Sequence, residues 1–337
     1  MADRPDMLDG AIPPEANTTL FGHSSAEHFL AESYRNNHLH HAILIEGPEG
    51  IGKATLAFRF ANHVISHPDP AEAPDRLSDP DPDSSVSRQI SSGASHNILH
   101  IRRPLDEKSG KVKSAITVDE VRRVGRFFNQ TDGSGNWRIA VIDPADDLNR
   151  NAANALLKVL EEPPKHAIFL VLSHAPGRLL PTIRSRCMKL ELNPLDKPDM
   201  SRVLEHLGVR FDLDSGYENT EGSAARALVM ANYGGIDIAA AFDSLMDRRA
   251  INDRAEIHKL AQALASKDRE VAYHFFVEHV IEHVRTQAAE LAMIGDMRRA
   301  AEEAEKATAV AEHFSRAETY NLDRTQTVIN LFSILLG

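Results

Sequence analysis

The sequence has a single cysteine, Cys187, among 337 residues. One thiol excludes an internal disulfide framework and any zinc site built from several cysteines. Long apolar runs are lacking too, because the longest, such as residues 167–172, fall far short of the ~18 residues that a membrane-spanning helix needs. The first residues have neither the basic nor the apolar stretch of a secretory signal. We therefore expect a cytoplasmic protein with no membrane partner.

An excess of positive charge is also absent. The chain carries 38 Lys and Arg against 49 Asp and Glu, a formal net charge of -11, which argues against a protein that coats nucleic acid through a generally basic surface. One local basic strip is a candidate for contact with DNA phosphates: Arg178, Arg184, Arg186 and Lys189. The alternative is that these side chains are solvated or used at a protein interface.

A glycine-rich segment, Gly47-Pro-Glu-Gly-Ile-Gly-Lys53, is typical of phosphate-binding loops. The apolar run 42–46 predicts a strand before it, and the spacing of Leu56, Phe60 and Val64 predicts a helix after it. Backbone amides at such a helix start can cradle phosphate oxygens, and the lysine adds a positive charge. The candidate nucleotide-site residues in this segment are Gly47, Gly50, Gly52, Lys53 and Thr55.

The groups that such a site needs for hydrolysis are missing. The position after the lysine, where a hydroxyl would bind magnesium, is Ala54, and Thr55 lies about 100° further round the helix. Asp143 ends a predicted buried strand over 138–143, but the next residue, where an activating glutamate is expected, is Pro144. We expect Asp146 and Asp147 to cap the following helix. The pattern indicates a loop that has lost hydrolysis.

The remaining periodicity divides the chain into three predicted domains. Strands at 97–101, 168–172 and 188–192, alternating with helices, predict a parallel α/β domain over residues 1–193. Helices over 201–207 and 224–233 predict a small helical domain over 194–234, and residues 235–337 predict an all-α domain of four or five helices. We expect the proline-rich, acidic segment 68–83 to be a mobile loop that buries too little surface to fold.

Three motifs carry a family resemblance: Val141-Ile-Asp-Pro-Ala-Asp-Asp-Leu148, Leu160-Glu-Glu-Pro-Pro164 and Ser185-Arg-Cys187. They resemble the gamma and delta-prime subunits of bacterial DNA polymerase III clamp loaders, which belong to the AAA+ family. Leu20-Phe-Gly-His23, His40-His-Ala42 and Asn321-Leu-Asp-Arg324 fit as well. Among these relatives the chain is most similar to delta-prime subunits of alphaproteobacterial type, over most of its length.

The resemblance implies a fold and residue roles. It implies an AAA+ parallel-sheet domain, a helical lid and a C-terminal collar that carries the assembly contacts. Arg186 would be an arginine finger that reaches the ATP site of a neighbouring gamma/tau subunit, although it could also be a plain surface arginine. Ser173 would stand where the family places its γ-phosphate sensor. The sensing arginine of the lid would fall at Ala225, and Arg226 is one position late.

The function implied is that of a non-hydrolysing subunit that helps to load the sliding clamp on primed DNA. Its partners would be gamma/tau and delta subunits, the sliding clamp and primer-template DNA in the assembled complex. No cofactor is required, although the degenerate loop is compatible with ATP, ADP or phosphate. The four-cysteine zinc module of many relatives is replaced by segment 68–83, so no zinc or other metal is expected.

Two enzyme classes remain as alternatives. One is an active, gamma/tau-like AAA+ ATPase in which Thr55 and Asp146 replace the lost ligands. The other is a metallopeptidase built on His279-Val-Ile-Glu-His283, where two histidines share one helical face but no third ligand is apparent. A further cluster, His38, His40 and His41, could bind a metal but lies in a loop before a strand, where solvated histidines are common.

Overall fold

The structure, a computed structural model, describes residues 7–106, 110–129, 136–247, 253–266 and 269–336. Its contacts divide the chain into two compact units, residues 1–225 and 226–337. The first unit holds a parallel sheet flanked by helices and the second is helical, so the predicted fold class, α/β plus all-α, is confirmed. The three-domain division with boundaries after residues 193 and 234 stays a prediction.

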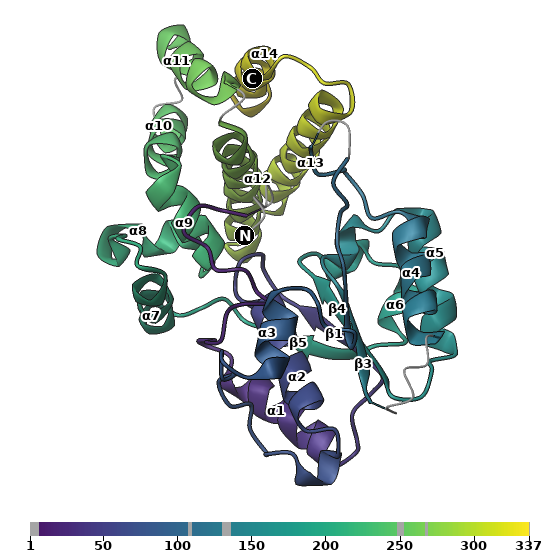
Figure 1. Cartoon of the computed structure of the whole chain (residues 1–337). Coiled ribbons are helices and arrows are strands. Elements are labelled where there is room, and N and C mark those ends of the chain that lie inside the picture. Colours follow the sequence, from purple (N-terminus) through teal and green to yellow (C-terminus); the bar gives the residue numbers. More distant parts are fainter. Residues whose placement is uncertain (1–6, 107–109, 130–135, 248–252, 267–268, 337) are drawn as a thin grey trace. The chain divides into compact units, whose positions relative to one another are not determined.

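The sheet of the first unit has five parallel strands in the order β2-β3-β4-β1-β5 (Figure 1). The strands are Ala42–Glu46 (β1), Ile98–Ile101 (β2), Arg138–Ile142 (β3), Ala167–Ser173 (β4) and Met188–Glu191 (β5). Each lies within a residue or two of a predicted strand. Because β1 and β4 pair in register from Ala42↔Phe169 to Glu46↔Ser173, their carboxyl ends meet at one edge of the sheet.

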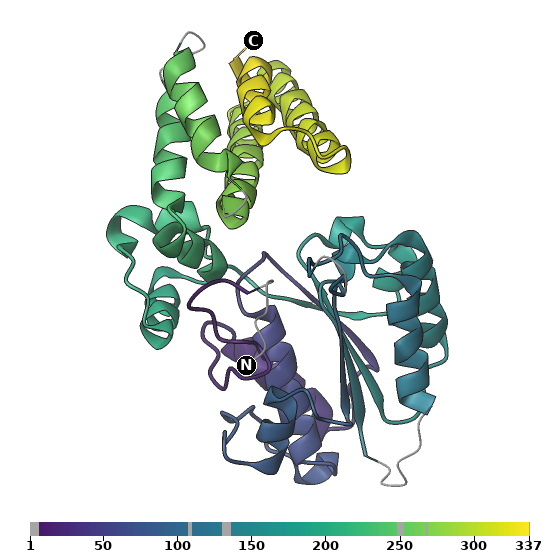
Figure 2. The ribbon, with the colours of Figure 1, turned by 45° about the horizontal axis from the view of Figure 1, so that its top comes forward.

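Helices cover both faces of this sheet, which is why its strands read as continuous apolar runs. Along β1, Ile43 and Ile45 join one buried cluster and Ala42 and Leu44 join the other, since successive side chains of a strand point to opposite faces. Figure 2 shows the two helical layers on either side of the sheet. One layer contains α1 (Ser24–Arg35), α2 (Lys53–Ser66) and α3 (Ser85–Ser91), and the other contains α4 (Val118–Asn129), α5 (Arg150–Glu161) and α6 (Pro181–Arg184).

Segment 68–83 packs more than its composition predicts. Ala73 and Leu77 are buried against the cluster of α1 and α2, and a 3-10 turn spans Pro70–Glu72. Asp79 pairs with Arg59 at 2.8 Å. The expectation that this segment buries too little surface to fold is therefore wrong, because two apolar residues suffice to anchor it on the cluster formed by α1 and α2. Its mobility stays a prediction.

Beyond Glu191 the described residues form helices and no strand, as the sequence predicts. Three follow the sheet: α7 (Lys197–Leu207), α8 (Leu213–Thr220) and α9 (Ala224–Asn232), which spans the boundary between the units. Helix α8 was not predicted: its eight residues contain only two large apolar side chains, and the side chain of Asp212 caps its start. The second unit continues with α10 (Gly235–Asp247), α11 (Arg254–Ala265), α12 (Glu270–Met293), α13 (Met297–Thr319) and α14 (Arg324–Leu336).

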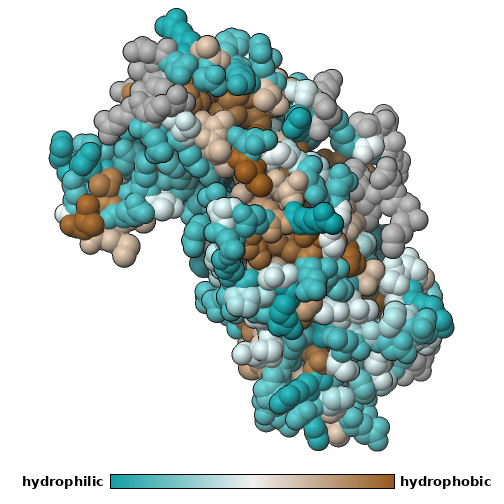
Figure 3. All heavy atoms as spheres, turned by 90° about the vertical axis from the view of Figure 1, so that its left-hand side faces the viewer, coloured by the Kyte–Doolittle hydropathy of each residue, from teal (hydrophilic) through white to brown (hydrophobic). Residues whose placement is uncertain are grey.

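Hydrophilic side chains dominate the surface shown in Figure 3, with apolar ones between them. Three strongly exposed large apolar side chains, Met293, Ile294 and Met297, lie around the turn between α12 and α13. In the part of the chain that the structure describes, no helix combines the length and apolar character that crossing a bilayer requires.

Candidate functional site

The lysine of the glycine-rich loop is folded onto the loop itself. Lys53 begins α2, is only 5% exposed, and its Nζ donates hydrogen bonds to the carbonyl oxygens of Gly47, at 2.7 Å, and Pro48. Burial lowers the pKa of Lys53 to about 8, against the opposing influence of the negative charges on Glu49, Asp143 and Asp146. The ammonium group that would grip phosphate is therefore already held by the chain.

The glycines of the loop are required by packing, whatever the loop binds. A Cβ on Gly50, where φ is +74°, would lie 2.3 Å from Cβ of Ala225 and 2.9 Å from its backbone nitrogen. The amide of Ala224 donates to the carbonyl oxygen of Gly50 at 3.1 Å. A Cβ on Gly47 would lie 2.4 Å from the carbonyl oxygen of Leu192. The mouth of the loop is thus in direct contact with residues 223–225 of the same chain.

The position where the resemblance predicts the sensing arginine of the lid is Ala225, which has no charge. Its methyl group lies against Gly50. In the second unit, the guanidinium of Arg226 lies over the ring of Phe275, 5.7 Å from its centroid. The arginine one position late is therefore engaged in cation–π packing among the helices.

The two residues after the lysine belong to the helix packing. Ala54 is packed against the apolar cluster that joins α1 and α2 to the sheet. Thr55 is buried in α2, with 9% of its surface exposed. The position that would supply a magnesium ligand therefore places a partly buried methyl group against the apolar cluster.

Asp143, at the end of β3, is paired with a residue that sequence reasoning missed. Nε2 of His100, on β2, lies 3.3 Å from Oδ2 of Asp143. The ring of His100 in turn packs edge-on against Phe58, with centroids 5.2 Å apart. A signal was available, because β2 and β3 are consecutive predicted parallel strands whose carboxyl ends meet at one edge of the sheet.

The expectation that Asp146 and Asp147 cap the following helix is wrong. Asn149 caps α5 by accepting a hydrogen bond from the amide of Ala152 at 2.9 Å. Asp146 instead accepts hydrogen bonds from Oγ of Ser173 at 2.8 Å, the amide of His174 at 2.7 Å and the amide of Ala175 at 3.3 Å.

Both aspartates lie in the 3-10 turn Ala145–Asp147, and the donors to Asp146 belong to the last residue of β4 and the two residues that follow it. Ser173, predicted as the sensor position, is fully buried, and its hydroxyl is directed at Asp146. Asp147 pairs with Arg103 at 3.1 Å.

The structure brings most of the predicted nucleotide-site residues together. The loop follows β1, Asp143 follows β3 and Ser173 ends β4, and these strands are neighbours in the sheet. The amide of Gly47 donates to the carbonyl oxygen of Ser173 at 3.3 Å, which joins two of these strand ends directly.

Arg186 lies near the opposite ends of the strands, where they begin. It precedes β5, whose first residue Met188 pairs with Ile43 near the start of β1, whereas the loop follows the end of β1. Its side chain is 37% exposed. One guanidinium nitrogen lies 2.7 Å from a carboxylate oxygen of Glu161, and another donates to the carbonyl oxygen of Thr182 at 3.1 Å. The guanidinium of the predicted arginine finger is therefore accessible to solvent, and two contacts within its own chain set its orientation.

The histidines that suggested metal sites have other partners. Nε2 of His279 lies 3.0 Å from Asp243, and both His279 and His283 pack edge-on against Phe242. Nε2 of His41 contacts the carbonyl oxygen of Leu160 at 3.1 Å. Within the described residues, no group of three or more His, Cys, Asp or Glu side chains is placed to hold a metal ion.

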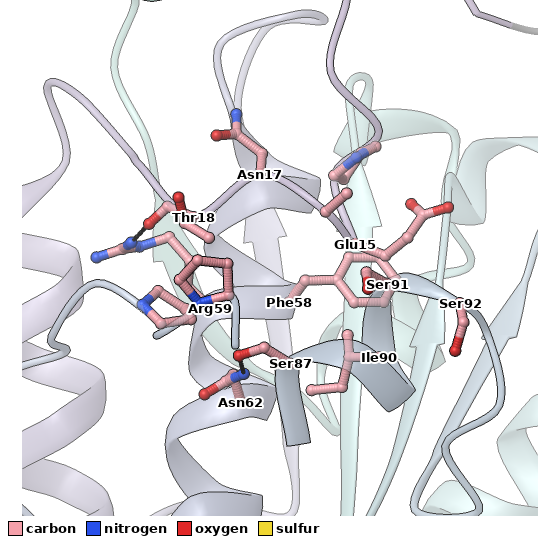
Figure 4. Close-up of a pocket in the computed structure, with 14 residues that line it drawn as sticks. Glu15, Asn17, Thr18, Phe58, Arg59, Asn62, Ser87, Ile90, Ser91 and Ser92 are labelled. Atoms are coloured by element: carbon pink, nitrogen blue, oxygen red, sulfur yellow. Dashed lines mark hydrogen bonds between the residues drawn. The ribbon is translucent and has the colours of Figure 1, made fainter. Parts of the chain in front are cut away.

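A cavity of about 370 Å³ lies elsewhere in the first unit, between α2, α3 and the N-terminal segment 14–18 (Figure 4). Phe58 and Ile90 form its apolar part, and Asn62 donates to Ser87 at 2.9 Å beside them. Arg59 donates to the carbonyl oxygen of Thr18 at its edge. None of the predicted site residues lines this cavity.

Comparison with known protein families decides the affiliation. The family described as "DNA polymerase III, delta subunit" matches residues 22–196, just over half of the chain. The chain belongs to the DNA polymerase III delta-subunit family. The matched segment contains every predicted site residue from Gly47 to Arg186, so the family signal and the candidate site coincide.

Individual relatives are consistent with this family. The chain is 37% identical over 150 residues to the DNA polymerase III subunit delta' of Pseudomonas aeruginosa, and 33% identical over 177 residues to that of Bacillus subtilis. These matches cover 44% and 52% of the chain, and 42% and 49% of the relatives, so the chain matches less than half of either relative. DNA polymerase III subunit tau of Escherichia coli is 27% identical over 77% of this chain and 34% of its own length. The predicted resemblance to delta-prime subunits is confirmed, and gamma/tau chains are similar as well.

Proposed function

We propose that this chain is the non-hydrolysing subunit of a DNA polymerase III clamp loader, and that it supplies Arg186 to the ATP site of a neighbouring gamma/tau subunit. In this role the chain is a rigid member of the complex and has no ATPase activity of its own. An arginine supplied in trans neutralises charge on the transferring phosphoryl group and can raise the rate by roughly 10³–10⁵.

The observation that carries the proposal is the state of the glycine-rich loop. Lys53 is bound by the loop's own carbonyl oxygens, and residues 223–225 lie directly against Gly50. Around it, Ala54 packs against the apolar cluster and Asp146 is held by Ser173 and two amides. The groups that would bind nucleotide and metal are occupied with holding the fold, while Arg186 keeps an accessible guanidinium.

The proposed partners are those that the resemblance to clamp-loader subunits implies. They are the gamma/tau and delta subunits, with the sliding clamp and primer-template DNA bound by the assembled complex. The helical second unit is proposed to carry the assembly contacts. No metal or zinc is required in this role, and a nucleotide or phosphate in the degenerate loop would not be turned over.

Reconstitution with gamma/tau and delta subunits tests the proposal. Arg186→Ala is expected to lower DNA-stimulated ATPase sharply, by about 10³-fold or more at the one ATP site that the arginine faces. Lys53→Ala is expected to leave the activity of the assembled complex nearly unchanged. Co-purification of all subunits with each variant shows that assembly is intact.

The opposite result, a large loss with Lys53→Ala and none with Arg186→Ala, would support the alternative of an active gamma/tau-like ATPase. ATP turnover by the isolated chain at the rate of the assembled loader would do the same. Stoichiometric zinc that is lost on His283→Ala would instead favour a metallopeptidase.

A further inference from the structure

The contact that holds Arg186 joins two sequence motifs that are 25 residues apart. Glu161 is the last residue of α5, within Leu160-Glu-Glu-Pro-Pro164, and Arg186 lies in the turn between α6 and β5. Both helices pack on the same apolar cluster, where Leu160 and Ile183 are buried. The backbone at both ends of the ion pair is therefore fixed by the core, although both side chains are partly exposed.

The geometry of the pair leaves the arginine able to bind an anion. A guanidinium has five N–H donors. One is directed at Glu161 and one at the carbonyl oxygen of Thr182, from different terminal nitrogens. Three donors remain for another acceptor. An arginine held at two points also loses less conformational freedom on binding phosphate than one that samples all its rotamers.

We propose that Glu161 is a positioning residue for Arg186: with the carbonyl oxygen of Thr182, it presets the direction of the guanidinium that reaches the neighbouring ATP site. This inference rests on the proposed function of Arg186. Glu161 does not touch the nucleotide and acts only through the arginine. Because the pair is solvent-exposed, its effect is bounded by the small coupling of surface ion pairs, about two- to fivefold in rate.

The chain provides a matched control in the next residue. Glu162 belongs to the same motif, carries the same charge and is exposed. Arg186 is paired with Glu161, so removing Glu162 tests the effect of lost surface charge near the motif without removing that pair.

The test uses the complex with gamma/tau and delta subunits and measures DNA-stimulated ATPase as kcat and KM. Glu161→Ala is expected to lower kcat by about two- to fivefold at unchanged KM for ATP. Glu161→Gln, which keeps an acceptor but no charge, is expected to fall between wild type and Glu161→Ala. Glu162→Ala is expected to match wild type. In an Arg186→Ala background, Glu161→Ala is expected to have no further effect, because its path to the reaction is gone.

Each other outcome has a definite meaning. An equal loss from Glu161→Ala with and without Arg186 would show that the carboxylate acts on structure and would overturn the positioning role. So would a kcat for Glu161→Ala that is unchanged or raised while Arg186→Ala is strongly impaired. If Arg186→Ala itself leaves the ATPase unchanged, the proposed function fails first.

Discussion

Single residues of the glycine-rich loop have a structural role that does not depend on nucleotide. Gly50 and Gly47 leave room for the backbone of residues 225 and 192, and Lys53 satisfies two loop carbonyl oxygens. A loop sequence of this kind can therefore persist after its catalytic partners are lost. The sequence alone shows the missing hydroxyl at Ala54, but it cannot show that the two glycines are needed for packing, because the residues they contact, 225 and 192, lie more than 100 residues along the chain.

Gly50→Ala is expected to destabilise the protein by more than its backbone conformation explains. A residue with a side chain at φ +74° costs of order 1 kcal/mol, and the close contact with Ala225 adds to that. Gly93→Ala is the matched control, because Gly93 has φ +70° with nothing within 4 Å of an added Cβ. Urea denaturation should show a larger loss for Gly50→Ala, and equal losses would refute the packing role.

Lys53→Met is expected to remove a pH dependence of stability. The pKa of Lys53 is about 8 when folded and 10.5 as the reference value. Between these values the unfolded state binds more protons, so the free energy of unfolding rises with pH, by up to roughly 3 kcal/mol for this group. The variant lacks this rise, because methionine has no titratable group.

Urea denaturation at pH 7, 8, 9 and 10 measures this difference. Lys158→Met serves as the control, because Lys158 is exposed on α5. Stability curves of wild type and Lys53→Met that run parallel from pH 7 to 10 would exclude a lowered pKa for Lys53.

Helices and strands follow from the sequence where apolar periodicity defines them. All five strands lie within two residues of prediction, and α2 follows the glycine-rich loop as predicted, because their apolar side chains pack in the two buried clusters of the sheet. The failures have a common cause, which is contact with other elements of the fold. Asp146 looked like a helix cap but binds the end of β4, and segment 68–83 looked unstructured but is tied to α2 through Asp79. Neither partner is visible in local sequence.

Arg59, on α2, joins α1 and segment 68–83 to this helix. Its side chain is only 3% exposed, and it pairs with Glu27 on α1 and Asp79 in segment 68–83, both at 2.8 Å. Arg59→Met is expected to cost about 3 kcal/mol, because the largely buried Glu27 loses its counter-charge. Urea denaturation measures the loss, and Arg59→Met combined with Glu27→Gln should recover much of it.

The pH dependence of this loss has a definite sign. Burial raises the pKa of Glu27, and Arg59 opposes that rise. Without Arg59 the folded pKa rises further, so the cost of the charged carboxylate is present above that pKa and is relieved as the pH falls toward 4.5. The defect of Arg59→Met should therefore be larger at pH 7.5 than at pH 4.5, and the opposite trend would exclude this cause.

Across the first unit, the two candidate sites lie at opposite ends of the strands of one sheet. The degenerate loop is at the carboxyl ends of the strands, and Arg186 precedes the start of β5. Parallel strands make this separation predictable once the strands are assigned. The ion pair of Arg186 with Glu161 is not predictable, since it depends on how the end of α5 meets the turn after α6. The family signal covers residues 22–196 and thus the sheet that carries both sites.

The division into two units separates the proposed finger from the proposed assembly contacts. The first unit has its own core, and residues 224–225 complete the contact with the loop, so a fragment of residues 1–232 that includes all of α9 is expected to fold. It keeps Arg186 but lacks helices α10 to α14.

If those helices supply the binding energy, the fragment should still stimulate the gamma/tau ATPase, but only at concentrations at least about 100-fold higher than the full chain requires. This factor corresponds to roughly 3 kcal/mol of lost binding free energy. Titration of fragment and full chain into gamma/tau and delta, with DNA-stimulated ATPase as the readout and circular dichroism to verify folding, measures this difference. Stimulation that also survives Arg186→Ala in the fragment would show that the arginine is not the group that acts.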